Sequence, residues 1–424
     1  MAQQDTERLR KLKKLSLVLD LDHTLLHATN SIGARQYQHR DYVRTLILPN
    51  QFEGGPSEPR HPKQALWMQH FVKLRPHLRE FLQTASDLYE VGVYTAGTRQ
   101  YAEQITMLLA RHMVGSRMDQ TDMDHLRHQI NHVEQQLARQ RQQQQKEAEK
   151  QQQQSEETPG DVPRKRVQFG DTNERTDAVT NETLHQLRSE LGEAERMEQQ
   201  ALEFRQRLFG SRIVSRTDTD LGAHVKSIRR IFPCGGTMAV LVDDREDVWA
   251  NAVDNETIGE PPDNLLLVRP YHWGPFAGFA DVNNASGNDY GADYADGDDE
   301  SADDKQLLWT SDVLRRIHEA YFETLEDNPQ PGRRSVPEIC RDLRRQILPN
   351  TKMVLSSLVP MNRPEVPGGP RPGYVRHAES LGAHLLSTVS PEVTHVVANR
   401  DGTDKMIAAR RVPGCFIVKP LWLM

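Results

Sequence analysis

A short apolar run ends in two acidic residues near the start of the chain. Residues Leu15–Leu19 read Leu-Ser-Leu-Val-Leu between polar segments, and Asp20 and Asp22 follow directly. A bounded run of this length is typical of a buried strand. Because side chains alternate along a strand, residues two apart point to the same side. The pattern predicts an α/β fold with a parallel sheet, and two carboxylates in one crevice at a strand end, where such sheets bind ligands.

Two later strands are predicted to end in polar residues of the same kind. Glu90–Tyr94 is followed by Thr95, and Met238–Val242 is followed by the pair Asp243 and Asp244. A hydroxyl beside backbone N–H groups can hold phosphoryl oxygens. Paired carboxylates at a strand end suit Mg²⁺, which takes oxygen ligands. Taken alone, Thr95 could be an ordinary helix cap and Asp244 a surface ion-pair residue.

The order of these residues favours a phosphoryl-transfer site. Asp20 can attack phosphorus, and Asp22 can protonate the leaving oxygen and later deprotonate a water molecule. Lys226, which precedes the acidic pair, can offset the charge of the transferring phosphoryl group, although it could also be a solvated helix residue. A lone pair of acidic residues would be weak support. Together with Thr95 and the second acidic pair, it predicts an aspartate-nucleophile phosphatase that uses Mg²⁺.

Composition limits the other functions open to this chain. It has 424 residues, a net charge of −7 and only 3 cysteines without metal-ligand spacing. The acidic balance argues against a direct nucleic-acid binder. The cysteine count fits a reducing compartment. No run approaches the roughly 20 apolar residues of a membrane span, and the first residues lack the apolar core of a secretory signal. We expect a soluble intracellular protein that makes no membrane contact.

The chain divides into segments of different composition. We predict a discontinuous catalytic domain over 1–118 and 205–280, an acidic linker over 281–304, a helical connector over 305–345 and a small unit over 346–424. Residues 119–204 are rich in Gln, Glu and Arg. There we predict two amphipathic helices around a disordered middle, from Arg139 to about Asn181. These helices either pair with each other or form a partner-binding coiled coil, and the short heptad runs favour the first interpretation.

Long stretches of the sequence resemble a known phosphatase family. They are LVLDLDHTLLHAT, FVKLRPHLREFL, VGVYTAGTRQYA, FGSRIVSR, VKSIRRIFPCGGTMAVLVDDREDVW and DVLRRIHEAYF. These stretches are similar to the haloacid dehalogenase superfamily, and within it to the TFIIF-associated phosphatases of the C-terminal domain of RNA polymerase II. The resemblance covers nearly all of 15–118 and 205–325 apart from loops.

The resemblance implies a role for each matching residue. Asp20 is the nucleophile, Asp22 the general acid and base, and Mg²⁺ is held by Asp20, the backbone carbonyl of Asp22 and Asp244. Thr95 and Lys226 bind the phosphoryl group, and Asp243 orients Lys226. The remaining substrate-binding positions implied by the match are Thr24, Arg75 and Tyr89. The fold implied is a parallel sheet flanked by helices, with an antiparallel insertion after the Asp20 motif.

One position departs from the family pattern. Relatives have Asp-Pro after the helix that follows YTAGTRQYA, where this chain has Ala110-Arg111. The departure puts the substrate wall contributed by that aspartate in doubt. Asp119, a little further along the chain, is a candidate replacement.

The last segment resembles a BRCT domain. The resemblance rests on SLGAHLLSTVSPEVTHVVANRDGT and on the terminal FIVKPLWLM. Ser356, Thr403 and Lys405 match the positions by which some BRCT domains hold a phosphate, although Ser356 could instead cap a helix and Lys405 be solvated. We expect Trp422 to be a core aromatic residue, and the last helix to be cut short by the end of the chain.

The resemblance implies a nuclear phosphatase that acts on the phosphorylated heptad repeats of RNA polymerase II and contacts general transcription factors such as TFIIF. The alternative from another functional class is a catalytically weak scaffold that binds transcription proteins through the BRCT unit and the insertion. A small-molecule or nucleic-acid-end phosphatase of the same superfamily is a third possibility. Turnover of a phosphoserine heptad peptide separates these three hypotheses.

Overall fold

The computed structural model describes residues 2–49, 67–156, 171–218, 226–252, 259–274, 276, 304–327, 334–358 and 373–423. These residues form two compact units. One contains 1–104 and 208–424, and the other contains 105–207. The predicted insertion over 119–204 lies inside the second unit. The finer domain boundaries stay predictions, and most of the predicted acidic linker lies outside the described residues.

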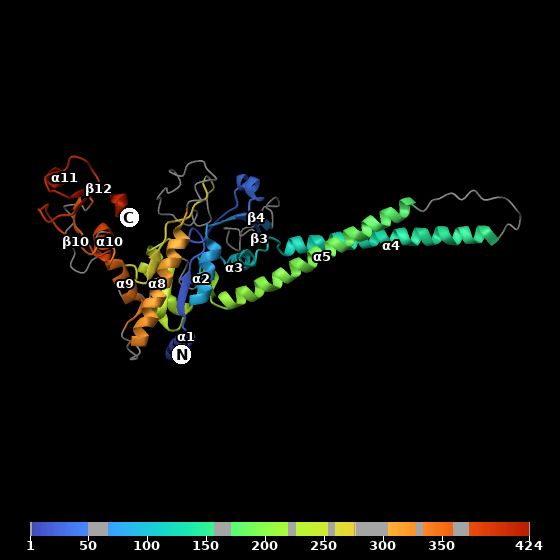
Figure 1. The fold of residues 1–424 in the computed structure, drawn as a ribbon, viewed down its shortest axis with the longest axis horizontal. Helices are drawn as coiled ribbons and strands as arrows, with labels where there is room; N and C mark the ends of the chain where they lie inside the picture. The colour runs from blue at the N-terminus through green and yellow to red at the C-terminus, as the bar shows by residue number, and fades with distance from the viewer. Residues whose placement is uncertain are drawn as a thin grey trace, which may run out of the picture. The chain divides into compact units, whose positions relative to one another are not determined.

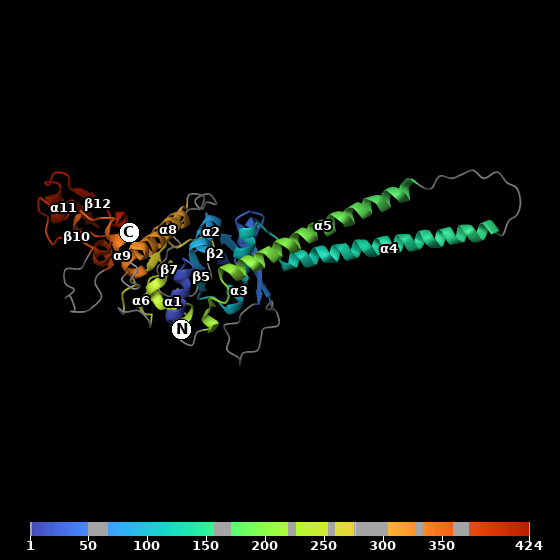
Figure 2. The same cartoon turned by 60° about the horizontal axis from the view of Figure 1, so that its bottom comes forward.

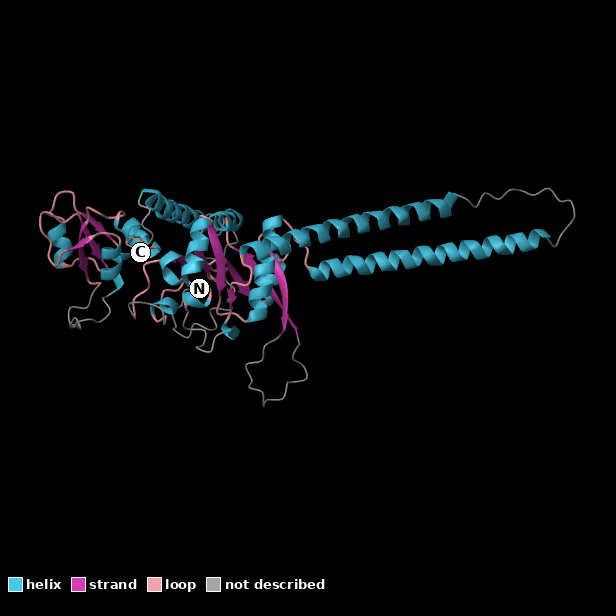
Figure 3. Cartoon of the chain, turned by 90° about the horizontal axis from the view of Figure 1, so that it is seen from below, coloured by secondary structure: helices cyan, strands magenta, loops and turns pink. Residues whose placement is uncertain are grey.

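A five-stranded sheet with parallel strands forms the centre of the first unit, as predicted. Its strands, in spatial order, are β6 (Ile213–Val214), β5 (Tyr89–Tyr94), β1 (Leu15–Leu19), β7 (Ala239–Asp243) and β8 (Leu265–Leu267). All four pairings are parallel. Every residue of β1 and β7 is buried, because these inner strands are covered on both faces and need apolar side chains on both. Figure 3 shows the strands between the surrounding helices.

Helices cover this sheet. They are α1 (Ala2–Lys11), α2 (Leu78–Leu88), α3 (Arg99–Val114), α6 (Asp247–Ala250), α8 (Gln306–Asp327) and α9 (Val336–Arg345). Helices α2 and α8 lie side by side (Figure 1 and Figure 2), and Arg315 of α8 donates a 2.8 Å hydrogen bond to Thr84 of α2. A capping box at Ser335 begins α9, since the Ser335 side chain accepts from the backbone of Glu338 and the Glu338 side chain accepts in return.

The predicted antiparallel insertion follows the Asp20 motif. Strands β2 (Leu26–Thr29), β4 (Trp67–Leu74) and β3 (Val43–Pro49) form a sheet in this order, and both pairings are antiparallel. The sheet buries Val43 and Phe71 against Trp273, which lies in the loop after β8. The antiparallel insertion is thereby packed against the loop that follows the last strand of the five-stranded sheet.

The second unit contains two long helices, α4 (Gln120–Glu156) and α5 (Asp171–Leu208). Leu137 of α4 packs with Leu184 of α5 in a shared apolar cluster, so the helices pair with each other. The predicted disorder from Arg139 to about Asn181 is wrong for 139–156 and 171–181, which are helical, while 157–170 lie outside the described residues. Gln, Glu, Lys and Arg are good helix formers, so a polar tract can extend a helix that is anchored by apolar turns.

The small C-terminal unit is an α/β domain with its own four-stranded sheet. Its strands, in spatial order, are β10 (His384–Leu385), β9 (Lys352–Ser356), β11 (His395–Ala398) and β12 (Phe416–Val418), all parallel. Its helices are α10 (Gly373–Ser380) and α11 (Asp404–Ala409). Val354 and Met353, neighbours on β9, belong to apolar clusters on opposite faces of the sheet. Its assignment as a BRCT domain stays a prediction.

The expected burial of Trp422 is wrong. Its side chain is 46% exposed and stacks on His395, with ring centroids 4.8 Å apart. Trp422 lies on a single 3-10 turn, which presents the ring to the edge of the sheet.

Among the described residues, none of the helices combines the length and apolar composition that a membrane span requires.

Candidate active site

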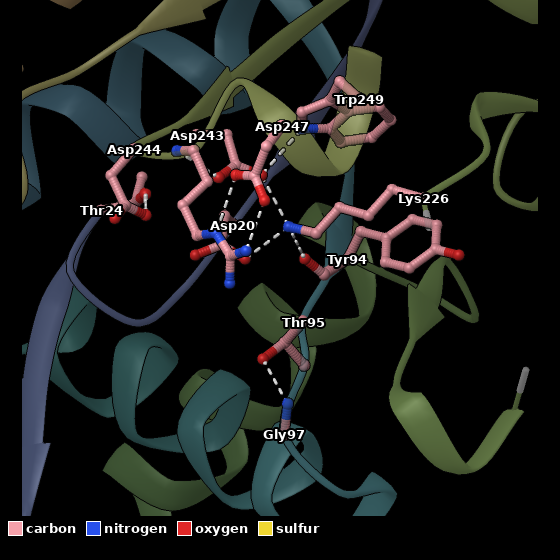
Figure 4. A network of polar contacts seen from close by, with 11 residues as sticks. Asp20, Thr24, Tyr94, Thr95, Gly97, Lys226, Asp243, Asp244, Asp247 and Trp249 are labelled. Carbon is pink, nitrogen blue, oxygen red and sulfur yellow. Dashed lines mark hydrogen bonds and ion pairs between the residues drawn. The ribbon is translucent and has the colours of Figure 1, made fainter. Parts of the chain in front are cut away.

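The predicted catalytic residues follow the carboxyl ends of three neighbouring strands. Asp20 follows β1, Thr95 follows β5, and Asp243 and Asp244 lie at the end of β7. In the sheet, Leu19 is level with both Val93 and Val242. Because the strands are parallel and in register, the residues that follow them converge at one edge (Figure 4). The sequence patterns of the three strands were therefore enough to predict that these side chains lie together.

The ammonium group of Lys226 lies between two carboxylates at this edge. Its Nζ donates to Asp20 Oδ1 at 2.6 Å, to Asp243 Oδ2 at 2.6 Å and to the carbonyl of Tyr94 at 3.0 Å. All three donor hydrogens of the ammonium are thus used, and the side chain is almost fully buried. Rings of Tyr94 and Trp249 also face Nζ, at 5.7 and 5.5 Å from their centroids. Lys226 is thereby fixed beside Asp20.

Asp243 is held from three sides and orients Lys226. Its Oδ2 accepts from Lys226 and, at 2.8 Å, from Nε1 of Trp249, while Oδ1 accepts from the backbone N–H of Arg245 at 2.9 Å. The predicted orienting geometry is thus present. Sequence reasoning missed Trp249, which lies in the DREDVW stretch after β7 and reaches back from α6. The spacing of six residues between Asp243 and Trp249 was the available signal.

The electrostatics of the cluster leave an excess of negative charge. Burial raises the pKa of Asp20, and Asp243 and Asp244 add to the rise while Lys226 opposes it. Burial lowers the pKa of Lys226, but its two carboxylate partners outweigh burial and raise this pKa above its ordinary value. Burial also raises the pKa of Asp244 to about 6, with a further contribution from Asp243. One ammonium facing three carboxylates favours the binding of a further cation.

Asp20, Asp243 and Asp244 form a set of candidate metal ligands. One carboxylate oxygen from each lies within 4.8 Å of the others. All are oxygen donors, which Mg²⁺ prefers, and the negative excess described above fits a divalent cation. Both oxygens of Asp243 accept hydrogen bonds from protein groups, which leaves Asp20 and Asp244 as the better ligands. The donor set therefore fits the predicted Mg²⁺ site.

Thr24 contacts this cluster rather than an open surface. Its hydroxyl donates to Asp244 Oδ1 at 3.2 Å, and the side chain is buried. This contact fixes a candidate metal ligand, and the substrate-binding role of Thr24 stays a prediction. This hydrogen bond also joins the turn after β1 to the end of β7. Figure 4 shows Thr24 and Asp244 beside Asp20.

Tyr101 holds Asp22 in place and was not predicted from the sequence. Its phenol donates to Asp22 Oδ1 at 2.5 Å. Burial raises the pKa of Tyr101, and Asp22 adds to the rise, so the phenol remains a donor. The ring lies against Gly97, where a Cβ atom would come within 2.4 Å of it. The only sequence signal was that Gly97 and Tyr101 both lie in the stretch VGVYTAGTRQYA. No sequence pattern shows that helix α3 brings Tyr101 to Asp22.

Thr95 lies at the end of β5 in the predicted place. Its Oγ1 accepts from the backbone N–H of Gly97 at 3.0 Å, and the residue is buried. Thr98, rather than Thr95, accepts from the first turn of α3, through the N–H of Tyr101 at 3.3 Å. The alternative that Thr95 is an ordinary helix cap is therefore wrong. Its role in phosphoryl binding stays a prediction.

Arg75 holds the turn that follows β1. Its Nη1 donates to the carbonyl of Thr24 at 2.9 Å, and its Nε donates to Asp304 Oδ2 at 3.0 Å. Burial lowers the pKa of Arg75, and Asp304 opposes this effect. These contacts position the loop that carries Asp20 and Asp22. Contact between Arg75 and substrate stays a prediction.

Tyr89 lies at the wrong end of the sheet for substrate binding. It begins β5, level with Leu15 at the start of β1, whereas the site is at the other end of both strands. Its hydroxyl donates to the carbonyl of Leu314 in α8 at 2.6 Å, and the ring is buried. The predicted substrate role of Tyr89 is contradicted, because similarity matched the position without showing which end of the strand it occupies.

The expected replacement for the missing family aspartate has another task. Ala110 is fully buried in α3. Asp119 caps α4, since its Oδ1 accepts from the backbone N–H groups of Thr121 and Asp122 at 2.8 and 3.0 Å. These two hydrogen bonds give Asp119 a structural role at the start of α4.

The candidate phosphate-binding residues of the C-terminal unit are only partly brought together. Ser356 Oγ and Thr403 Oγ1 are 2.8 Å apart, and Thr403 caps α11. Lys405 Nζ donates to the carbonyl of Leu355 at 3.0 Å. Lys405 thus contacts the residue before Ser356, and phosphopeptide binding by this unit stays a prediction.

Comparisons with known proteins agree with this architecture. Residues 15–140 match the NLI interacting factor-like phosphatase family. A phosphatase of the RNA polymerase II C-terminal domain from Caenorhabditis elegans is 23% identical over 97% of this chain and 43% of its own length. The RNA polymerase II C-terminal domain phosphatase-like 4 of Arabidopsis thaliana is 24% identical over 95% of this chain and 64% of its own length. The chain thus spans less than two thirds of these relatives.

Solved structures show the same fold. The fission yeast RNA polymerase II CTD phosphatase Fcp1, bound to beryllium fluoride, aligns with 100% of this chain and 94% of its own, with a TM-score of 0.58 and 21% identity. A second Fcp1 structure aligns over the same shares with a TM-score of 0.59 and 22% identity. The chain therefore shares the fold of these structures, and the predicted parallel sheet flanked by helices is confirmed. The match to the NLI interacting factor-like phosphatase family begins at Leu15, so it includes the first strand of the sheet and Asp20 at its end.

Proposed function

We propose that this chain is an Mg²⁺-dependent phosphatase that removes phosphate from serine and threonine in the heptad repeats of RNA polymerase II. The observation that carries this proposal is the position of Lys226, whose ammonium bridges Asp20 and Asp243 at 2.6 Å from each. This arrangement, at the end of parallel strands, is suited to stabilising charge that develops beside Asp20. The names of the relatives support the choice of substrate.

In the first half of the reaction, a carboxylate oxygen of Asp20 attacks phosphorus opposite the serine oxygen. The new oxygen–phosphorus bond forms as the bond to serine breaks, which leaves an aspartyl-phosphate. Asp22 donates its proton to the departing serine oxygen. Lys226, fixed by Asp243 and the Tyr94 carbonyl, lies beside the reacting carboxylate and offsets the charge of the phosphoryl oxygens.

In the second half, the Asp22 carboxylate takes a proton from water as the water oxygen attacks phosphorus. The bond between phosphorus and Asp20 breaks, and inorganic phosphate leaves. Tyr101, through its 2.5 Å hydrogen bond, holds Asp22 in one orientation for both proton transfers. Arg75 fixes the backbone of the same turn through the Thr24 carbonyl, and the Thr24 hydroxyl links this turn to Asp244.

The side chains of Asp20 and Asp244, with the backbone carbonyl of Asp22, would hold the Mg²⁺ ion. When bound, Mg²⁺ supplies positive charge that keeps Asp20 ionised and offsets the negative phosphoryl group. The raised pKa values of Asp20 and Asp244 support this assignment, because both carboxylates lack sufficient compensating charge from Lys226 alone.

Action on RNA polymerase II would place the protein in the nucleus, and we propose TFIIF as a partner. The family resemblance supports both points, and the polymerase named for the relatives supports the first. Imaging of the tagged chain and binding of purified TFIIF test these two points. Exclusion from the nucleus, or no binding by purified TFIIF, would contradict the respective point.

The decisive experiment measures phosphate release from a phosphoserine heptad peptide by the full chain, with Mg²⁺ or with chelator. Asp20→Asn keeps the size of the side chain and should lower kcat by at least about a thousandfold. Asp87→Asn, on the exposed surface of α2, is the matched control and should keep kcat. Activity that survives in Asp20→Asn contradicts the mechanism.

Two further substrates separate the alternative functions. A small aryl phosphate and a nucleotide are offered under the same conditions. Preference for the nucleotide would favour a small-molecule or nucleic-acid-end phosphatase. Binding of transcription proteins without turnover of any substrate would favour the scaffold hypothesis.

A further inference from the structure

Three histidines from distant parts of the chain meet beside the catalytic turn. His23 and His27 flank the start of β2, and His272 lies in the loop after β8. One ring nitrogen from each lies within 4.8 Å of the others. The ring centroid of His23 is 5.1 Å from that of His27 and 4.5 Å from that of His272. This cluster is distinct from the carboxylates at the strand ends.

The backbone fixes the orientation of His23. The residue has a left-handed φ of 61°, its N–H donates to the carbonyl of Leu26 at 2.8 Å, and its carbonyl accepts from the N–H of Tyr271 at 2.7 Å. A left-handed conformation in a residue other than glycine is uncommon and requires support from its surroundings. Two backbone hydrogen bonds supply that support here. The ring is thus directed toward the segment that carries His272.

A further hydrogen bond determines which ring nitrogen of His23 can bind a ligand. Nδ1 lies 3.0 Å from the carbonyl oxygen of Tyr271. A carbonyl only accepts, so Nδ1 carries the hydrogen and Nε2 carries the lone pair. Metal-binding histidines commonly donate their second ring N–H to a backbone carbonyl in this way. The contact therefore prepares Nε2 of His23 as a metal ligand.

The cluster is shielded from solvent. His27 is fully buried, His23 is 3% exposed and His272 is half-buried. Imidazole nitrogen is a ligand that Zn²⁺ prefers, whereas Mg²⁺ prefers oxygen. Zinc sites with three histidine ligands and a fourth position for water occur in proteins. We propose that His23, His27 and His272 bind one Zn²⁺ ion.

The geometry requires a modest closure of the three rings. Tetrahedral zinc, with a zinc–nitrogen distance of about 2.0–2.1 Å, places its ligand nitrogens about 3.4 Å apart. The nitrogens here lie within 4.8 Å, so each pair would move together by at most about 1.4 Å. His272 is the least buried of the three side chains, so its ring can supply most of this movement.

The bound ion would join two segments that carry catalytic parts. His23 directly follows Asp22, and His272 lies next to Tyr271, whose ring faces the guanidinium of Arg75 at 5.4 Å. Zinc at this place would hold the loop after β8 against the turn that carries Asp20 and Asp22. Zinc binding is measured without phosphatase turnover, so this proposal can fail or succeed separately from the proposed function.

The test measures zinc binding by the full chain in the presence of excess Mg²⁺, which occupies the carboxylates. Zinc content after dialysis is determined by mass spectrometry, and affinity by competition with a chromophoric chelator. We expect one Zn²⁺ per chain, and a visible absorption band of tetrahedral geometry when Co²⁺ replaces it. His272→Ala should weaken zinc binding at least about tenfold. Absence of stoichiometric zinc in the wild-type chain overturns the proposal.

Three controls keep the outcome clear. His128→Ala removes an exposed histidine of α4 and should leave zinc binding unchanged. Asp244→Asn should also leave it unchanged, and if it abolishes binding while His272→Ala does not, the ion is on the carboxylates and the proposal fails. Circular dichroism of metal-free His272→Ala checks folding, and His23→Gln gives a second ligand variant that must also bind more weakly.

Discussion

The phenolic hydroxyl of Tyr101 donates a 2.5 Å hydrogen bond to Oδ1 of Asp22, the proposed general acid. Tyr101→Phe keeps the ring and removes this bond. A hydrogen bond to a charged group contributes about 1.5–3 kcal/mol, so we expect kcat to fall about tenfold or more while KM changes little. Steady-state kinetics on the phosphoserine heptad peptide measure this change. Tyr374→Phe in the C-terminal unit is the control, and equal kcat values for both variants would contradict a positioning role.

Gly97 allows Tyr101 to approach Asp22. A Cβ atom at this position would lie 2.4 Å from Cδ1 of Tyr101 and 3.1 Å from Cε1, so the ring must shift. We expect Gly97→Ala to lower kcat about as much as Tyr101→Phe, because both lose the bond to Asp22. The double variant should be little worse than either single variant, as expected for coupled residues.

The matched control for Gly97 is Gly192→Ala in α5, where an added Cβ atom meets no heavy atom within 4 Å. This change should keep kcat and slightly favour the helix. Additive losses in the Gly97→Ala, Tyr101→Phe double variant would show that the two residues act separately.

Lys226 stabilises the fold as well as the proposed reaction. Lys226→Met leaves Asp20 and Asp243 buried without their shared cation, which should lower the free energy of unfolding by about 3–5 kcal/mol. Adding Asp243→Asn removes one of the two uncompensated charges and should recover part of this loss. Activity should be absent in both variants, since neither has the ammonium beside Asp20.

Urea unfolding in chelator separates the two effects of Lys226. Recovery of stability without recovery of activity is the expected pattern. If the double variant is less stable than Lys226→Met alone, repulsion between the carboxylates is not the cause of the loss.

The strand-end residues could be predicted because their signal is local. An apolar run that ends in a polar residue identifies Asp20, Thr95 and Asp243 without knowledge of the tertiary structure. Parallel pairing then brings them together, and resemblance supplied the role of Lys226. Contacts that cross between elements carried no such signal. Tyr101 approaches Asp22 from α3, and His272 approaches His23 from a segment about 250 residues later.

The predictions that were wrong also have physical causes. Tyr89 was assigned to the site because similarity fixes a sequence position, whereas only strand direction shows which sheet edge the position occupies. The tract after Arg139 was expected to be disordered because it is polar, although its residues favour helix and continue a paired helix. Trp422 was expected in the core, but the 3-10 turn leaves its ring at the surface.

His318 should make stability depend on pH. Its Nε2 donates to the carbonyl of Lys13 at 2.8 Å, and burial lowers its pKa below 6.5, against the opposing effect of that hydrogen bond. As the pH falls, His318 is therefore protonated at a higher pH in the unfolded chain than in the folded chain. Stability should be lost as pH falls through 6.5 toward the lower pKa of the folded state, and this contribution should be flat above about pH 7.5.

The variant His318→Gln keeps a donor for Lys13 without titrating in this range. Urea midpoints at several pH values, measured in chelator, should fall less steeply for this variant than for the wild type. His128→Gln, exposed on α4, should keep the wild-type slope. Parallel slopes in the wild type and His318→Gln would show that other groups cause the dependence.

Gly382 lets the C-terminal unit pack against the end of α9. It has a φ of +93°, and an added Cβ atom would lie 2.1 Å from the carbonyl oxygen of Arg345, the last residue of α9. A left-handed conformation alone costs a residue with a Cβ about 1–2 kcal/mol. Gly382→Ala adds a backbone overlap that only movement of the whole turn relieves, so we expect its cost to exceed that range.

Gly402→Ala shares the left-handed φ, at +76°, but meets nothing within 4 Å and should cost only the strain. Chemical unfolding of both variants gives the two costs, and hydrogen exchange should show faster opening of β9 and β10 in Gly382→Ala alone. Equal costs would mean that the close approach to Arg345 contributes nothing to the packing of this unit.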